Sequence, residues 1–293
     1  MRAPVEAELV LDARAETGEG PVWDFRDQSL VWIDVTQGLI HQFDPGTGHD
    51  ASFDAGQHVG AVALRSARGY ALAVRGGFAV VDLDGGVVEP LADTEATAPG
   101  NRMNDGKCDS SGRFWAGSMA YTETGRDGSL YRLDRDHSVT TMLTDQGISN
   151  GLGWSPDDRV MYHIDSLAGG VDAYDFSPET GQITNGRRLI DVAPEDGIPD
   201  GMTVDADGYL WIALWNGWSI RRYRPDGAFD RAIRLPVRQV SCCTFGGADL
   251  SDLYITTAAR GLSTTGFQEQ PGAGGLFRSQ PGVAGLATHP YEG

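Results

Sequence analysis

Four short stretches of the sequence place a carboxylate or amide side chain beside a glycine, directly before a run of strand-like residues. They are Gly18-Glu19-Gly20-Pro21, Asn101-Arg102-Met103-Asn104-Asp105-Gly106, Ser149-Asn150-Gly151 and Gly197-Ile198-Pro199-Asp200-Gly201. Glycine tolerates positive φ and proline fixes φ, so these stretches predict sharp approaches to strands. Each could equally be a solvated turn, which is the ordinary role of Pro-Asp-Gly. If the four converge, they form a metal site with oxygen ligands and a polar rim.

The residue types in these stretches suit a hard divalent cation. Glu19 and Asp200 supply carboxylates and Asn150 supplies an amide oxygen, with water or substrate left to complete the coordination. Oxygen ligands of this kind accept Ca²⁺, Mg²⁺, Mn²⁺, Zn²⁺ or Fe²⁺, so the sequence does not choose the ion. Arg102 and Asn104 belong to the same group of stretches and are expected nearby.

Two other motifs indicate different chemistry and are less well supported, and a third kind of site lacks its motif altogether. Gly147-Ile148-Ser149-Asn150-Gly151 matches the G-x-S-x-G nucleophile elbow, but a strand is predicted after it where that motif requires a helix. Asp205-Ala206-Asp207-Gly208 begins like a calcium loop, yet no glutamate stands at position twelve, so a hairpin turn is expected. The histidines form no H-x-H or H-E-x-x-H pattern, which leaves a histidine zinc site unsupported.

Composition excludes several classes of protein. The 293 residues carry 23 Lys and Arg against 41 Asp and Glu, a net charge of −18 that repels nucleic acid. Met1–Glu6 lacks the apolar core of a signal peptide, and no run approaches the length of a membrane span. A soluble protein without nucleic-acid or membrane partners is therefore expected.

The cysteines favour a reducing compartment. Cys108, Cys242 and Cys243 form no CxxC pattern and no disulfide framework, so a cytoplasmic protein with buried free thiols is expected.

A repeated pair of strand-like runs predicts the architecture that must position the site. The first runs of the pairs are marked by Trp32, Leu72, Trp115, Tyr162, Trp211 and Tyr254, at steps of 40, 43, 47, 49 and 43 residues. A period of this size, with strand pairs and frequent turn signals, is typical of propeller blades rather than of a sandwich. The 40 glycines and 14 prolines agree with many tight turns. The sequence predicts an all-β, six-bladed β-propeller formed by residues 1–293 as a single domain.

Propeller geometry gives a reason for the four stretches to meet. Loops from every blade gather at one end of the central channel, and the four stretches are expected between blades, before the first strand of blades one, three, four and five. Their common position predicts a metal site at one end of the channel.

At these residues the chain resembles the SMP-30/gluconolactonase/luciferin-regenerating-enzyme family, over nearly its whole length. The matching motifs are Gly18-Glu19-Gly20-Pro21-Val22-Trp23, Asn101-Arg102-Met103-Asn104-Asp105-Gly106-Lys107, Ala116-Gly117-Ser118-Met119, Ile148-Ser149-Asn150-Gly151-Leu152, Ile164-Asp165-Ser166, Ile198-Pro199-Asp200-Gly201-Met202, Ser241-Cys242-Cys243 and Phe245-Gly246-Gly247. The resemblance implies a six-bladed propeller and one divalent metal ion held by Glu19, Asn150 and Asp200.

The resemblance also implies a substrate side to the site. In the family, residues matching Arg102 and Asn104 contact the oxygens of a sugar lactone, and a glutamate on a lid touches the substrate as well. The nearest candidate here is Glu123, on a lid at residues 121–127 that is shorter than the lid of regucalcin, a family member.

The leading functional hypothesis is hydrolysis of an aldonolactone to the open aldonic acid. The metal would act as a Lewis acid on the lactone carbonyl, and Asp200 would be the general base that activates water. The alternatives are a phosphotriester hydrolase, a calcium-binding regulatory propeller without turnover, and a scaffold, which would leave the four acid or amide positions unexplained. The expected partner is a small sugar lactone, and the chain is expected to be a monomer or a weak homo-oligomer.

Overall fold

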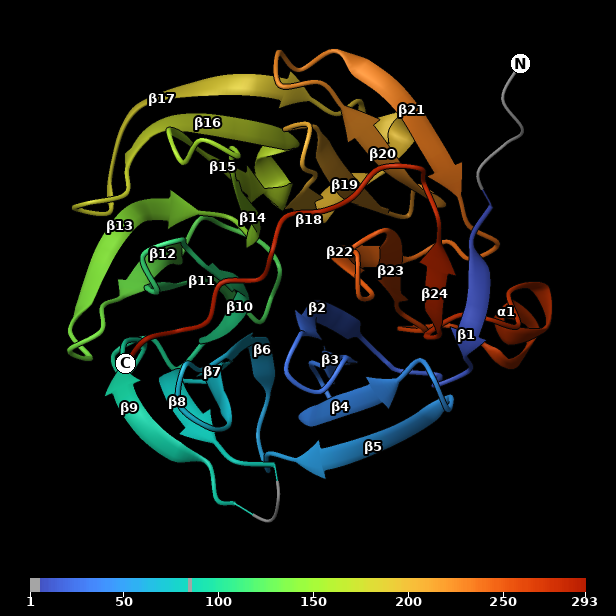
Figure 1. Cartoon of the computed structure of the whole chain (residues 1–293), viewed down its shortest axis with the longest axis horizontal. Helices are drawn as coiled ribbons and strands as arrows, with labels where there is room; N and C mark the ends of the chain where they lie inside the picture. The colour runs from blue at the N-terminus through green and yellow to red at the C-terminus, as the bar shows by residue number, and fades with distance from the viewer. Residues whose placement is uncertain (1–5, 84–85) are drawn as a thin grey trace.

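The fold is a ring of antiparallel sheets around a central channel (Figure 1). The structure, a computed structural model, describes residues 6–83 and 86–293, so most of the N-terminal stretch in which no signal peptide was expected lies outside the described residues. Within the described ranges there are six sheets of four strands each, and the all-β, six-bladed β-propeller prediction is confirmed.

Within each blade the strands are given in order from the channel outward. Blade one contains β2 (Gly18–Asp24), β3 (Ser29–Asp34), β4 (Leu39–Asp44) and β5 (His49–Asp54). Blade two contains β6 (Val59–Leu64), β7 (Tyr70–Val74), β8 (Gly77–Val81) and β9 (Glu89–Asp93). Blade three contains β10 (Asn101–Cys108), β11 (Phe114–Ala120), β12 (Gly128–Leu133) and β13 (Val139–Gln146). Blade four contains β14 (Ser149–Trp154), β15 (Val160–Asp165), β16 (Gly170–Ser177) and β17 (Gln182–Asp191). Blade five contains β18 (Ile198–Val204), β19 (Leu210–Trp215), β20 (Ser219–Tyr223) and β21 (Phe229–Arg234). Blade six contains β22 (Val240–Gly246), β23 (Asp252–Thr257), β24 (Leu276–Ser279) and β1 (Glu8–Leu11).

Helices are few, which agrees with the all-β prediction. In the described part of the chain they are the short α1 (Thr264–Glu269) and the 3₁₀ turns η1 (Ser166–Ala168) and η2 (Pro194–Asp196). None of these is long and apolar enough to cross a membrane.

The location of the four acid or amide stretches corrects the prediction. They were expected between blades, but they form the first residues of the innermost strands β2, β10, β14 and β18. The two runs recognised per blade are the middle strands, and β3 and β4 have the predicted bounds. The sequence did not predict the innermost strands as strands, because both of their faces are buried. Burial on both faces removes the alternating pattern that marks a half-buried strand.

The ladder of each innermost strand is interrupted by a β-bulge near the start of the strand. In β18 the register shifts between Pro199 and Met202, so that Asp200 and Gly201 stand opposite a single partner residue. Similar shifts occur in β2, β10 and β14 around Gly20, Asn104 and Asn150. A bulge bends the strand and redirects a side chain, which is why bulges are frequent beside functional sites.

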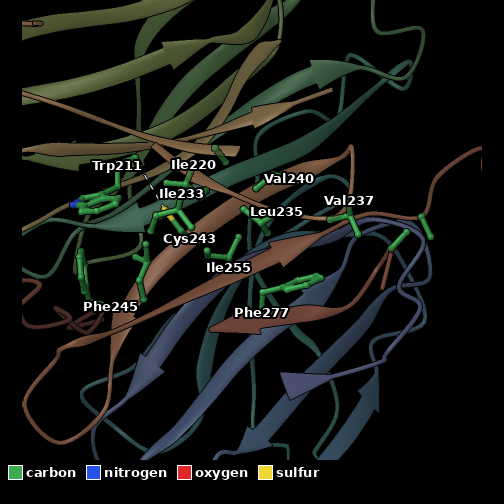
Figure 2. Packing of buried hydrophobic residues seen from close by; sticks show 14 residues of the cluster. Trp211, Ile220, Ile233, Leu235, Val237, Val240, Cys243, Phe245, Ile255 and Phe277 are labelled. Carbon is green, nitrogen blue, oxygen red and sulfur yellow. Dashed lines mark hydrogen bonds between the residues drawn. The ribbon is translucent and has the colours of Figure 1, made fainter. Parts of the chain in front are cut away.

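Apolar side chains packed between adjacent blades form the core. Figure 2 shows the cluster between blades five and six, in which Trp211, Phe245 and Phe277 are almost completely buried. Cys243 belongs to this cluster, and its thiol donates to the Trp211 carbonyl at 3.6 Å. All three cysteines are free and buried, as predicted.

A buried aspartate fixes the turn after the innermost strand in several blades. Asp205 accepts hydrogen bonds from Trp211 Nε1 at 2.9 Å and from Arg222 Nη2 at 2.7 Å. Its other oxygen accepts from the backbone N–H of Asp207 and of Tyr209. The turn at Asp205 therefore joins β18 to β19, and the hairpin prediction for this stretch is confirmed.

The two ends of the described chain close the ring. The N-terminal strand β1 pairs with β24 and so completes blade six as its outermost strand. The C-terminal segment crosses the face of the propeller shown in Figure 1 and ends beside blades two and three. It is fixed there by Tyr291, whose backbone exchanges hydrogen bonds with Leu64 and Ser66.

Candidate metal and substrate site

The starts of the innermost strands meet at one end of the channel. Glu19 from β2, Asn150 from β14 and Asp200 from β18 line one pocket of about 120 Å³. All three side chains are more than nine-tenths buried, with relative exposures of 9%, 4% and 8%. The structure thus brings together the three residues proposed as metal ligands from blades one, four and five, while their roles stay predictions.

The hydrogen bonds within this group leave one ligand oxygen free. The Asn150 amide N–H donates to Asp200 Oδ1 and, at 3.1 Å, to Ser166 Oγ. Glu19 Oε2 accepts from the backbone N–H of Gly20 at 2.7 Å. The Asn150 amide oxygen is buried and has no hydrogen-bond partner among the described residues. An unpartnered buried oxygen is unfavourable, and a cation coordinated there would satisfy it.

Buried acids dominate the electrostatics of the pocket. Burial raises the pKa of Glu19 well above its ordinary value, and the charges of Asp200 and Asp105 raise it further. Burial and then the charge of Asp105 raise the pKa of Asp200 in the same way. Burial also raises the pKa of Asp105, against the opposing charge of Lys107. Asp105 does not line the pocket, but it is a buried acid whose charge acts on both carboxylates. Sequence reasoning did not single it out, although it stands beside Asn104 in the same bulge.

These properties fit a divalent cation. A nearby positive ion stabilises ionised carboxylates and would offset the burial that raises their pKa values. Among the described residues, no three His, Cys, Asp or Glu side chains gather closely enough to hold a metal by themselves. The set therefore requires the amide oxygen of Asn150 together with the carboxylates of Glu19 and Asp200, which is a donor set for a hard cation.

Two of the three residues proposed for the substrate side, Arg102 and Asn104, line the same pocket. Arg102 donates through Nη1 to the Met103 carbonyl at 3.0 Å and to Asn104 Oδ1 at 2.7 Å. The Asn104 amide N–H in turn donates to the Ser149 carbonyl at 3.0 Å. Arg102 is therefore fixed at one edge of its guanidinium while it lines the pocket beside Glu19 and Asp200.

Glu123 also lines the pocket, from the lid that follows β11. Its carboxylate forms an ion pair with Arg260, a residue 137 positions away that lines the pocket as well. Sequence reasoning did not identify Arg260, since no local pattern marks a partner so distant in the chain. The lid is further tied by Tyr121, whose hydroxyl lies 3.2 Å from His58 Nδ1.

Ser149 is not available as a nucleophile. Its hydroxyl lies 2.9 Å from His163 Nε2, but both side chains are almost completely buried, and the elbow is followed by the strands β14 and β15. Burial lowers the pKa of His163 to about 4, so this histidine is neutral at physiological pH. The pair packs inside blade four, and the structure gives the serine-hydrolase hypothesis no support.

Fold and pocket together define the class: a six-bladed propeller with buried carboxylate and amide oxygens at one end of its channel. Residues 17–259 match the family described as the SMP-30/Gluconolactonase/LRE-like region, and the chain belongs to this family.

Relatives match along almost the entire chain. It is 38% identical to regucalcin of Bos taurus and 37% identical to regucalcin of Xenopus laevis, with 99% of both chains covered in each case. Among solved structures it is similar to regucalcin from Agrobacterium tumefaciens, described as a calcium-binding protein, with a TM-score of 0.94 and 27% identity. That match covers 99% of this chain and 98% of the other.

Proposed function

We propose that this protein is a metal-dependent sugar-lactone hydrolase that opens an aldonolactone to the aldonic acid. The observation that carries the proposal is the convergence of Glu19, Asn150 and Asp200 in one pocket, with the Asn150 amide oxygen buried and unpartnered. Membership of the gluconolactonase-containing family supports a lactonase-type activity.

In this proposal Glu19, Asn150 and Asp200 hold one divalent cation, which when bound supplies Lewis-acid chemistry to the lactone carbonyl. Asp200 accepts a proton from the water that attacks the carbonyl carbon, and it returns that proton to the ring oxygen as the ester C–O bond breaks. General base catalysis of this kind contributes typically ~10²–10⁴ in rate. The burial of Asp200 suits the role, because it removes competing water from the proton transfer.

The substrate is oriented by the polar side of the pocket. Arg102 presents a planar guanidinium that donates to ring and hydroxyl oxygens, and its bond to Asn104 fixes the plane of that group. Glu123 accepts hydrogen bonds from the lactone hydroxyls at the mouth of the pocket. A polyhydroxylated ring would thus meet a hydrogen-bond donor at Arg102 and an acceptor at Glu123 in the same pocket.

A metal-dependent lactone panel tests the proposal. Pentono- and hexonolactones are added to chelated protein, a single metal ion is restored at a time, and acid release is followed in a pH-stat. We expect hydrolysis of at least one lactone to require metal restoration. Absence of hydrolysis with every metal and every lactone contradicts the proposal.

A second candidate is a calcium-binding propeller without turnover. The description of the Agrobacterium regucalcin as a calcium-binding protein supports it, and the ligand types in the pocket are those that Ca²⁺ accepts. Calorimetric calcium binding, lost in Asn150→Ala, combined with no hydrolysis in the lactone panel would favour this candidate over the first.

A further inference from the structure

The ion pair between Glu123 and Arg260 spans the mouth of the pocket. Glu123 follows β11 in blade three, and Arg260 follows β23 in blade six. Blades three and six lie on opposite sides of the channel, as Figure 1 shows for β11 and β23. Both residues line the pocket that holds Glu19, Asn150 and Asp200. The pair therefore lies across the route into the site.

The backbone at Glu123 is held in an unusual conformation. Its φ of 56° lies in the left-handed region, which residues other than glycine rarely adopt. The Glu123 N–H donates to the Ala120 carbonyl at 3.0 Å, and the Tyr121 N–H donates to the Gly100 carbonyl at 2.9 Å. The short lid thus turns tightly where β11 ends. This turn places the Glu123 side chain at the pocket.

The turn alone does not fix the carboxylate, because a glutamate side chain has several rotatable bonds. Within the described ranges, Arg260 is the hydrogen-bond partner that the Glu123 carboxylate has. The side chains are 38% and 41% exposed, so solvent would otherwise leave the carboxylate free to move. An ion pair that orders a binding group before the ligand arrives lowers the entropic cost of binding.

We propose that Arg260 is a positioning residue that holds Glu123 over the pocket, so that the carboxylate is presented to the hydroxyl groups of a polyhydroxylated lactone. The inference rests on the proposed function and deepens it. In this role Arg260 acts through Glu123.

The first test measures the lid without any substrate. Hydrogen–deuterium exchange of the peptide covering residues 121–127 is compared between the wild type and Arg260→Gln. We expect faster exchange in Arg260→Gln. The matched control is Arg187→Gln, which removes the Arg187–Asp175 pair of similar exposure, 49% and 51%, on blade four. Unchanged lid exchange in Arg260→Gln overturns the proposal, whatever the lactone panel shows.

The second test uses the metal-loaded protein and the lactone that the wild type hydrolyses best. Because exposed ion pairs contribute modestly, Arg260→Gln should raise KM roughly two- to fivefold and leave kcat unchanged. Arg260→Lys should recover part of the loss. In a Glu123→Gln background, Arg260→Gln should have no further effect, since both changes remove one interaction.

Other results of these tests distinguish a failure of the positioning role of Arg260 from a failure of the proposed lactonase function. Additive effects of the two substitutions, or a fall in kcat, would show that Arg260 contacts the substrate or the chemistry directly and would overturn its role through Glu123. Salt supplies a further check, because an exposed pair is screened: KM of the wild type should rise with ionic strength more than KM of Arg260→Gln. Absence of lactone hydrolysis in the wild type rejects the proposed function, and lid exchange then decides the positioning role alone.

Discussion

Asp200 combines two predicted roles, as a ligand of the metal and as the base that activates water. Asp200→Asn keeps the size of the side chain and an oxygen that can accept from Asn150, but it removes the charge. We expect turnover to fall by at least ~10²-fold, while the thermal midpoint and the circular dichroism spectrum remain those of a folded propeller. The measurement is lactone hydrolysis in the pH-stat.

Asp191→Asn is the matched control for this substitution. Asp191 has a side chain that is 86% exposed and far out on blade four, at the end of β17, so its loss should not affect turnover. Wild-type activity in Asp200→Asn would remove Asp200 from the role of base.

The acids of the pocket make the stability of the metal-free protein depend on pH. The folded-state pKa of Glu19 is raised by burial, then by Asp200 and Asp105, so its contribution to stability is present below about pH 4 and is lost as pH rises through the folded pKa. Glutamine does not ionise, so Glu19→Gln avoids the loss of stability that the wild type undergoes as pH rises. In chelator at pH 8, Glu19→Gln should therefore melt above the wild type, and the difference should shrink toward pH 4.

Thermal melts at both pH values, with Glu269→Gln on the exposed side of α1 as the control, measure this effect. A shift of about 1–2 °C corresponds to ~1 kcal/mol in a domain of this size. A pH-independent difference would show that no unfavourable charge is buried at Glu19.

The sequence was informative about single residues where residue type and local context were distinctive. Glu19, Asn150 and Asp200 each stand beside glycine at the start of a strand, and that shared context predicted that they meet. Asp105 and Arg260 were missed for different reasons. Asp105 belonged to one of the four stretches but received no role, because its burial follows from the closed ring and not from its local sequence. Arg260 reaches Glu123 only because the ring closes.

At the scale of elements, the middle strands of each blade were predictable and the others were not. Runs such as β3, of aromatic and aliphatic residues bounded by turn signals, are distinctive in sequence. The innermost strand β18 contains proline and glycine within a bulge, which reads as a turn. The outermost strand β5 is polar and mostly exposed. The propeller could thus be inferred from its period, but the strands that carry the site could not be distinguished from loops.

The bulge in β18 should be sensitive to a single methyl group at Gly201. A Cβ at this position would lie 2.9 Å from Cys242 Cα, against the neighbouring innermost strand β22. Backbone atoms cannot move aside easily, so Gly201→Ala should destabilise the fold by ~1–3 kcal/mol and displace the adjacent Asp200. We expect weaker metal binding in calorimetry and a lower midpoint in urea.

The control for this prediction is Gly100→Ala, since a Cβ at Gly100 meets no heavy atom within 4 Å. Gly100 directly precedes β10, as Gly197 directly precedes β18. Gly100→Ala should therefore leave both metal binding and the urea midpoint unchanged. Equal behaviour of the two variants would mean that close packing of the innermost strands does not determine the geometry of the bulge.

At the scale of the whole molecule, a propeller is stable only when its first and last blades are joined. Here β1 supplies the outermost strand of blade six, and Glu8 pairs with Arg278 across that junction. The C-terminal segment adds a second closure, because it crosses from blade six to blades two and three (Figure 1). Neither closure is visible in the repeat period, which counts blades but does not say which strands the chain ends supply.

Tyr291 is the anchor of the second closure, and its removal tests how much the closure contributes. The ring is completely buried in the cluster between blades two and three, with Phe78 and Phe114, and its hydroxyl donates to the Asp134 carbonyl at 2.9 Å. Tyr291→Ala should cost ~3–5 kcal/mol in unfolding free energy, as the loss of a buried aromatic ring does, whereas Tyr291→Phe should cost about 1 kcal/mol for the hydrogen bond. Urea denaturation measures both, and hydrogen exchange should show β6 and β10 losing protection first in Tyr291→Ala. If Tyr291→Ala unfolds like Tyr291→Phe, the segment covers the channel without supporting the ring.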